Sequence, residues 1–257
     1  LMVVTRAEGV PPAYQHLTPL AALALPLALL AGYLSSFVVQ TLVRRLTLGV
    51  FESVQGLAVL ALAILAVLRA AAATGLPLAA AGGVSLLIAA GFYAGAFVVL
   101  ERTQGRGVNY VYFGVVGVVL TLFGSALLTS GVILGAAWGA LAVAAAFFGW
   151  RFDRFTLRAH GAAYVFAAGV ATGVLSAVYH ALLAAAAERW QALSFEALLV
   201  VVAAAGSYLL MVAARQGEQR WFQRLPGFIA ALVAVAGADG AAWAIAARSS
   251  DSLELGC

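Results

Sequence analysis

Residues 101–118, ERTQGRGVNYVYFGVVGV, and residues 153–170, DRFTLRAHGAAYVFAAGV, share a pattern at an offset of 52 residues. Each stretch begins with an acid followed by an arginine, and a second arginine comes four residues later. These arginines are Arg102 and Arg106 in the first stretch and Arg154 and Arg158 in the second. The matches continue as Tyr112, Gly117 and Val118 against Tyr164, Gly169 and Val170. A third pair, Arg220 and Arg224, has the same spacing. Because each pair precedes an apolar run long enough to cross a bilayer, the pattern predicts a tandem, parallel repeat of a two-helix unit in a membrane protein.

The composition of the whole chain supports the same class. Of the 257 residues, 65% are hydrophobic and 9% are charged, and the mean hydropathy is +1.05. A soluble domain carries roughly 25% charged residues. The apolar runs are continuous, whereas strands of a membrane barrel alternate apolar and polar residues. The sequence therefore predicts an all-α integral membrane protein.

The number of spans follows from the length of the apolar runs, since a transmembrane helix needs about 20 residues. We expect a bundle of about eight helices that forms one transmembrane domain over residues 1–257, without a soluble domain. The predicted spans are residues 17–43, 46–68, 76–100, 108–128, 132–150, 161–187, 192–214 and 226–247. Pro26 is the only residue expected to interrupt a helix interior.

The orientation is predicted from the arginines, because all 14 basic residues are arginine. Ten of them fall in the loops after the first, third, fifth and seventh spans, and the others are Arg6, Arg69, Arg189 and Arg248. By the positive-inside rule the arginine pairs lie in the cytoplasm and both termini in the periplasm. The arginine-only, alanine-rich composition indicates a GC-rich bacterial genome, so the predicted location is the bacterial inner membrane.

Polar side chains inside the predicted spans are the first candidates for function. Asp239 falls near the middle of the last span, Glu52 about two turns inside the second, and Gln55 one turn further along the same face. Charged groups are costly in a bilayer and usually face a bundle interior or water. One interpretation is a proton or cation relay through Glu52 and Asp239. The other is a pair of protonated carboxyls that hydrogen-bond to neighbouring helices.

Histidines are the next candidates. His160 and His180 lie near opposite ends of the sixth span, about 30 Å apart along a helix, so they cannot share one metal ion. No metal site is predicted, and the sequence requires no cofactor. A single-ligand tetrapyrrole pigment is one hypothesis for either histidine, and a hydrogen-bonded interfacial role is the other. The chain has one cysteine, Cys257, and no HExxH or GxSxG motif, so no catalytic residue is predicted.

Two further sets of residues are expected to make contacts. Glycines at intervals of four residues favour close helix packing, and they are Gly131, Gly135, Gly139, Gly169 and Gly173. The arginine pairs are expected to contact anionic lipid headgroups or an acidic partner on the cytoplasmic side.

Two functions remain open at this point. The first is a non-catalytic accessory subunit of a larger bacterial membrane complex, an energy-transducing or pigment-containing one among the options. The second is a proton- or ion-coupled small-solute transporter that uses Glu52 and Asp239. The expected partners are the lipid bilayer and other membrane subunits, and no nucleic acid.

Overall fold

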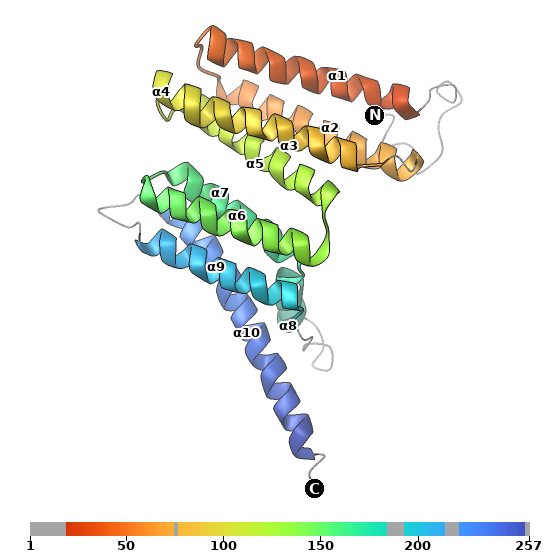
Figure 1. Ribbon diagram of the computed structural model, residues 1–257, viewed down its shortest axis with the longest axis vertical. Coiled ribbons are helices and arrows are strands. Elements are labelled where there is room, and N and C mark those ends of the chain that lie inside the picture. The colour runs from red at the N-terminus through yellow and green to blue at the C-terminus, as the bar shows by residue number, and fades with distance from the viewer. Residues whose placement is uncertain (1–18, 75–76, 184–192, 214–220, 255–257) are drawn as a thin grey trace. The chain divides into compact units, whose positions relative to one another are not determined.

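The computed structural model describes residues 19–74, 77–183, 193–213 and 221–254. All regular elements within these ranges are helices. The chain divides into two compact units, unit 1 from Leu1 to Leu128 and unit 2 from Thr129 to Cys257 (Figure 1). Arg189, Arg220 and the ends of several predicted spans lie outside the described residues.

Unit 1 contains the first four predicted spans as helices. They are α1 (Pro19–Val38), which continues as a π-helical turn, η3 (Val39–Val43); α2 (Val50–Thr74); α3 (Ala79–Ala94), which continues through a second π-helical turn, η4 (Gly95–Leu100), into α4 (Glu101–Thr103); and α5 (Val108–Leu128). Pro26 lies inside α1.

Within unit 1 the longest packing is between α3 and α5, and α1 packs along α2. The core is aromatic where the helices meet: Phe37 and Tyr112 make an edge contact, and Phe92 and Phe113 lie 4.8 Å apart between ring centroids. At the other end, α3 and α5 approach through Gly82 and Gly124. A Cβ atom on either glycine would lie 2.8 Å from the carbonyl oxygen of the other. This close crossing therefore requires glycine on both helices.

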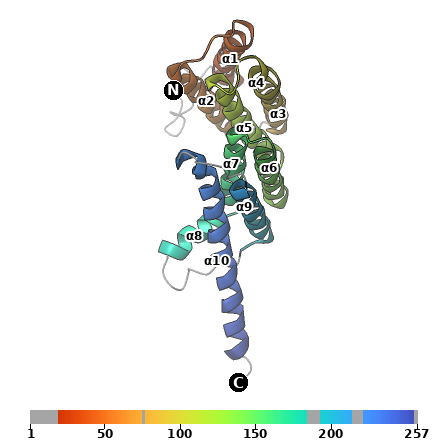
Figure 2. The same cartoon turned by 90° about the vertical axis from the view of Figure 1, so that its left-hand side faces the viewer.

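Unit 2 contains the remaining spans. Its elements are α6 (Gly131–Arg151), α7 (Phe155–Ala171), α8 (Val174–Leu183), α9 (Phe195–Ala213), a 3₁₀ turn η6 (Trp221–Arg224) and α10 (Leu225–Glu254). α6 packs against α7 and α9, and α10 packs against α9, α7 and α8 (Figure 2). Small side chains allow this packing: the core holds Ala146, Ala162 and Ala230 around Met211.

The sixth predicted span is broken in the structure. α7 and α8 meet at an angle of 62°, and Gly173 between them has a φ of +79°. Its neighbours close the helix: the Thr172 N–H donates to the Ala168 carbonyl at 2.9 Å and the Gly173 N–H to the Val170 carbonyl at 3.2 Å. A glycine in this left-handed conformation is the common end of an α-helix. The prediction that only Pro26 would interrupt a span is therefore wrong.

Seven helices among the described residues are long and apolar enough to cross a membrane, and the number is eight if α7 and α8 together form one span. The predicted all-helical fold and its many apolar helices are thus confirmed.

Candidate functional site

Asn109, at the start of α5, makes three side-chain hydrogen bonds. It is buried. Its Oδ1 accepts from the Leu48 N–H at 2.8 Å, and its Nδ2 donates to the Leu46 carbonyl at 2.8 Å and to Gln104 Oε1 at 2.7 Å. Gln104 Nε2 in turn donates to the Thr41 carbonyl at 2.7 Å. We call this arrangement the Asn109 clasp, because it holds the α1–α2 connection against the start of α5.

The clasp changes the position of Glu52. Because residues 46–48 are bonded to Asn109, α2 begins only at Val50, and Glu52 lies in its first turn rather than two turns inside a span. The carboxylate is exposed and folds back against Gly49. A negative charge in the first turn is favourable because it faces the positive end of the helix dipole. Gln55 Nε2, one turn further, donates to Tyr33 Oη at 2.6 Å and so joins α2 to α1.

Asp239 is the fifteenth of the 30 residues of α10. On α10, Gly237 packs on Val201, and a Cβ atom on Gly240 would lie 3.3 Å from Leu193 Cδ1. Leu193 comes two residues before α9 begins. Asp239 is therefore level with the first turns of α9 rather than with its middle, and its side chain is exposed.

The same end of unit 2 contains the α7–α8 break. A Cβ atom on Gly135 of α6 would lie 2.7 Å from Thr172 Cγ2 and 3.9 Å from the Cβ of Glu196. Glu196 is half-buried in the first turn of α9, where the Ser194 hydroxyl accepts from the Ala197 N–H at 3.2 Å. We call Gly135, Thr172, Gly173 and Glu196 the break site. The Thr172 hydroxyl in this site donates to the Ala168 carbonyl of α7 at 2.8 Å.

The five glycines expected to pack helices fall into two groups. Cβ atoms on Gly135, Gly139 and Gly169 would each meet a side chain of another element, namely Thr172, Ala203 and Val233. Gly131 and Gly173 instead have positive φ angles, and a Cβ on either would meet nothing within 4 Å. At these two positions glycine allows the left-handed backbone conformation found at helix ends.

The two arginine turns form equivalent ion pairs. Arg106 Nε lies 3.1 Å from Glu101 Oε1, and an Arg158 guanidinium nitrogen lies 3.4 Å from Asp153 Oδ1. Their surroundings differ, because the Arg106 side chain is 50% exposed and that of Arg158 is 8% exposed. Gly149 makes room for Arg158: a Cβ there would lie 2.7 Å from Arg158 Cγ.

The other arginines of the predicted pairs lie nearer the surface. Arg102 and Arg224 are exposed, and the Arg154 guanidinium carbon lies 5.4 Å from the centre of the Phe152 ring.

The two histidines lie on opposite sides of the break. His160 is buried in α7, whereas His180 is exposed on α8 with its ring 5.7 Å from that of Tyr179. Among the described residues, no group of three His, Cys, Asp or Glu side chains could hold a metal ion.

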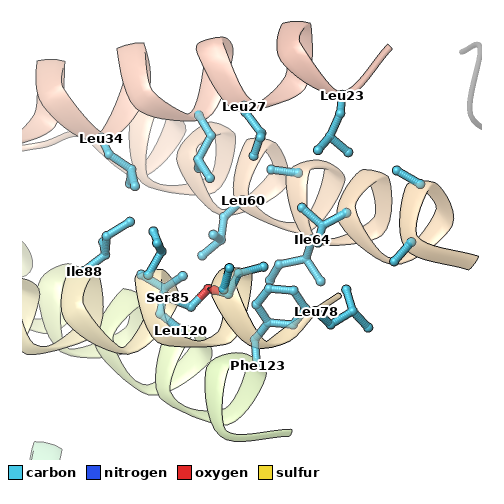
Figure 3. A pocket seen from close by; sticks show the side chains of 18 of the residues that line it. Leu23, Leu27, Leu34, Leu60, Ile64, Leu78, Ser85, Ile88, Leu120 and Phe123 are labelled. Carbon is cyan, nitrogen blue, oxygen red and sulfur yellow. The ribbon is translucent and has the colours of Figure 1, made fainter. Parts of the chain in front are cut away.

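Each unit also has a hollow lined mainly by apolar groups. The unit 1 groove has a volume of about 470 Å³ and is lined by residues of α1, α2, α3 and α5 (Figure 3). The unit 2 groove, about 780 Å³ in volume, follows α6 and α9 and is lined largely by glycine and alanine.

Comparison with known proteins adds no relative: no family model, curated protein or solved structure matches this chain.

Proposed function

We propose that this chain is a multi-pass, non-catalytic subunit of a larger complex in the bacterial inner membrane. The observation that carries the proposal is the unit 2 groove. Gly135, Gly139 and Gly206 line it together with Ala136 and Ala140, so the backbones of α6 and α9 are thinly covered there. In lipid, a surface of small residues gains most from close packing with another helix, because apolar burial alone supplies no drive.

The hydrogen bonds of the polar side chains support a structural role. Asn109 and Gln104 bind backbone groups of the α1–α2 connection, and Gln55 binds Tyr33. Glu101 and Asp153 pair with arginines of their own turns. In the proposed placement these turns face the cytoplasm, where Arg102 and Arg224 contact anionic headgroups.

We also propose that α3–α5 and α6–α7 are two copies of one helix pair. Six buried residues of α5 have buried counterparts in α7 at an offset of 52; the pairs are 109/161, 110/162, 112/164, 113/165, 116/168 and 117/169. Buried residues of α3 and η4 have counterparts in α6 at an offset of 53; the pairs are 82/135, 85/138, 89/142 and 96/149. The sequence offset between the two copies is therefore 53 in the first helix and 52 in the second. The π-helical turn η4 lies between these two regions in the first copy. A π-helical turn contains one residue more than an α-helical turn, which accounts for the difference.

The subunit proposal is tested by purification in a gentle detergent from cells that express the chain at its natural level. We expect a partner polypeptide in fixed proportion, and the absorbance spectrum of the preparation shows whether a pigment accompanies it. Ala140→Phe should release the partner because Ala140 is exposed in the unit 2 groove. The control is Ala61→Phe, at an exposed position of α2. A wild-type chain that purifies alone, or a complex that survives Ala140→Phe, would contradict the proposal.

A transporter is the second candidate, and the break site favours it. Many transporters bind ions where a helix is interrupted within the membrane. Here Thr172 and Glu196 both face Gly135 of α6 beside the break, while Glu52 in the first turn of α2 and Asp239 in the middle of α10 are exposed. Proton uptake into vesicles that contain the purified chain distinguishes this candidate. If transport occurs, Glu196→Gln should abolish it, whereas Glu52→Gln should not. The absence of uptake by the wild-type chain would remove this candidate.

A further inference from the structure

The unit 1 groove has the length of one membrane leaflet. Its lining on α1 runs from Leu23 to Leu34 and on α2 from Leu60 to Ala71. Eleven helical rises of 1.5 Å make each of these stretches about 16 Å long. The hydrocarbon core of a bilayer is about 30 Å thick, so one leaflet measures about 15 Å. Figure 3 shows side chains of α1 and α3 on either side of the groove, with Leu60 and Ile64 of α2 between them.

The side chains that line the groove favour a hydrocarbon ligand over a polar one. Nearly every lining group is an aliphatic or aromatic side chain. The Ser85 hydroxyl is also in the lining, but it donates to the Ala81 carbonyl at 2.8 Å within its own helix. A polar ligand would lose its hydration there without gaining hydrogen bonds. The groove has a volume of about 470 Å³, and its lining side chains would lack van der Waals partners if it were empty. A bound hydrocarbon chain would supply those contacts.

One end of the groove offers a positive charge at the depth of lipid headgroups. The lining includes Val67 and Ala70 of α2, and Arg69 lies between them and is exposed. Arg69 is three residues before the end of the apolar span Val50–Ala72. An arginine side chain near a helix end extends to the membrane surface, where it contacts phosphate groups.

We propose that the unit 1 groove binds one acyl chain of an anionic phospholipid whose headgroup contacts Arg69. The inference rests on the proposed placement of the chain in a membrane. By the predicted orientation, this lipid belongs to the periplasmic leaflet.

The test uses the full chain in vesicles of equal parts phosphatidylcholine and phosphatidylglycerol. The phosphatidylglycerol carries a photoreactive diazirine on one acyl chain, and illumination is followed by mass spectrometry of peptides. We expect label at Leu60, Ile64 and Ile88. Ala81→Phe should fill the groove and lower this label several-fold, because Ala81 lines it. Ala90→Phe, at an exposed position on α3 outside the lining, is the matched control.

A second pair of variants tests the headgroup. Arg69→Gln should reduce labelling by phosphatidylglycerol several-fold and leave labelling by a diazirine phosphatidylcholine unchanged. Arg44→Gln, at an exposed arginine that follows η3 at the other end of unit 1, should change neither.

Each outcome separates this inference from the proposed function. Label spread equally over exposed residues such as Leu87 and Val54, or label that is insensitive to Ala81→Phe, would show ordinary surrounding lipid and overturn the groove site alone. A groove cross-linked to another polypeptide would also overturn it while leaving the subunit proposal intact. Release of the chain from vesicles by alkaline carbonate would overturn the membrane placement, and both proposals with it.

Discussion

At the scale of single residues, Asn109 has the clearest structural role. It satisfies the Leu46 carbonyl and the Leu48 N–H, which lie in the connection between α1 and α2 and belong to no helix. Buried backbone groups without partners are costly, particularly where water is excluded. The side chain therefore substitutes for the hydrogen bonds that a continuous helix would supply.

The first prediction concerns this side chain. Asn109→Leu removes three hydrogen bonds and leaves buried partners unsatisfied, so it should lower the free energy of unfolding by about 1–3 kcal/mol. Gln40→Leu is the control, because Gln40 Nε2 donates to Ser36 Oγ at an exposed site of one helix. Unfolding of both variants in detergent is followed by circular dichroism. Equal stabilities would show that the clasp does not hold the connection.

The second prediction compares Arg106 and Arg158, which occupy equivalent places in the sequence pattern. Arg106→Gln should change stability by less than about 1 kcal/mol, since the Arg106 side chain itself is half-exposed to solvent. Arg158→Gln should cost more, because the side chain of Arg158 is packed over Gly149 and its loss removes buried contacts. The same unfolding assay measures both variants. A larger loss for Arg106→Gln would contradict the burial difference.

At the scale of elements, the main departure from a simple bundle is the α7–α8 break. Hydropathy is high on both sides of Thr172 and Gly173, so an apolar run alone predicts one straight span. The interruption depends on the φ of +79° at Gly173, which a residue with a side chain adopts only at a cost.

The third prediction follows from that angle. Gly173→Ala should destabilise unit 2 by about 1–2 kcal/mol, because the left-handed conformation is strained for alanine. Gly83→Ala, in the interior of α3 with no atom within 4 Å of the added Cβ, should instead stabilise the protein by about 0.5–1 kcal/mol. Thermal unfolding of the two variants gives the signs. A stabilising effect of Gly173→Ala would mean that α7 and α8 form a continuous helix.

At the scale of the whole molecule, the proposed membrane placement gives a number of crossings that depends on how α7 and α8 are used. The described residues contain seven helices that could each cross alone, and the bent pair could supply the eighth. With eight crossings, both termini lie on the same side. If α7 and α8 return to the side from which they enter, the loop after α8 faces the cytoplasm.

The fourth prediction is the resulting topology. Reporter fusions after Arg158 and Arg224 should read cytoplasmic, and fusions after Arg189 and at the C-terminus should read periplasmic, because arginine-rich loops stay inside. A cytoplasmic reading after Arg189 would show that α7 and α8 form a re-entrant loop. It would then leave seven crossings and place the termini on opposite sides.

The sequence by itself determined the all-helical fold and the approximate course of its apolar helices. Long apolar runs can satisfy their backbone groups only within a helix, so runs such as 108–128 and 132–150 appear as α5 and α6 with nearly the expected ends. The ion pairs of the two arginine turns also follow from local spacing, because each acid and its arginine are five residues apart.

Only the tertiary structure decided where the polar groups lie along the packed helices. α2 begins at Val50 because Asn109, more than 60 residues away, binds the connection before it, and this places Glu52 at a helix end. The level of Asp239 is set by the packing of Gly237 and Gly240 on residues of and before α9. The burial of Arg158 and the unit 1 groove likewise arise from how helices pack. Contacts between residues far apart in the chain cannot be read from apolar runs, because a helix that is apolar on all sides carries no pattern that identifies its neighbours.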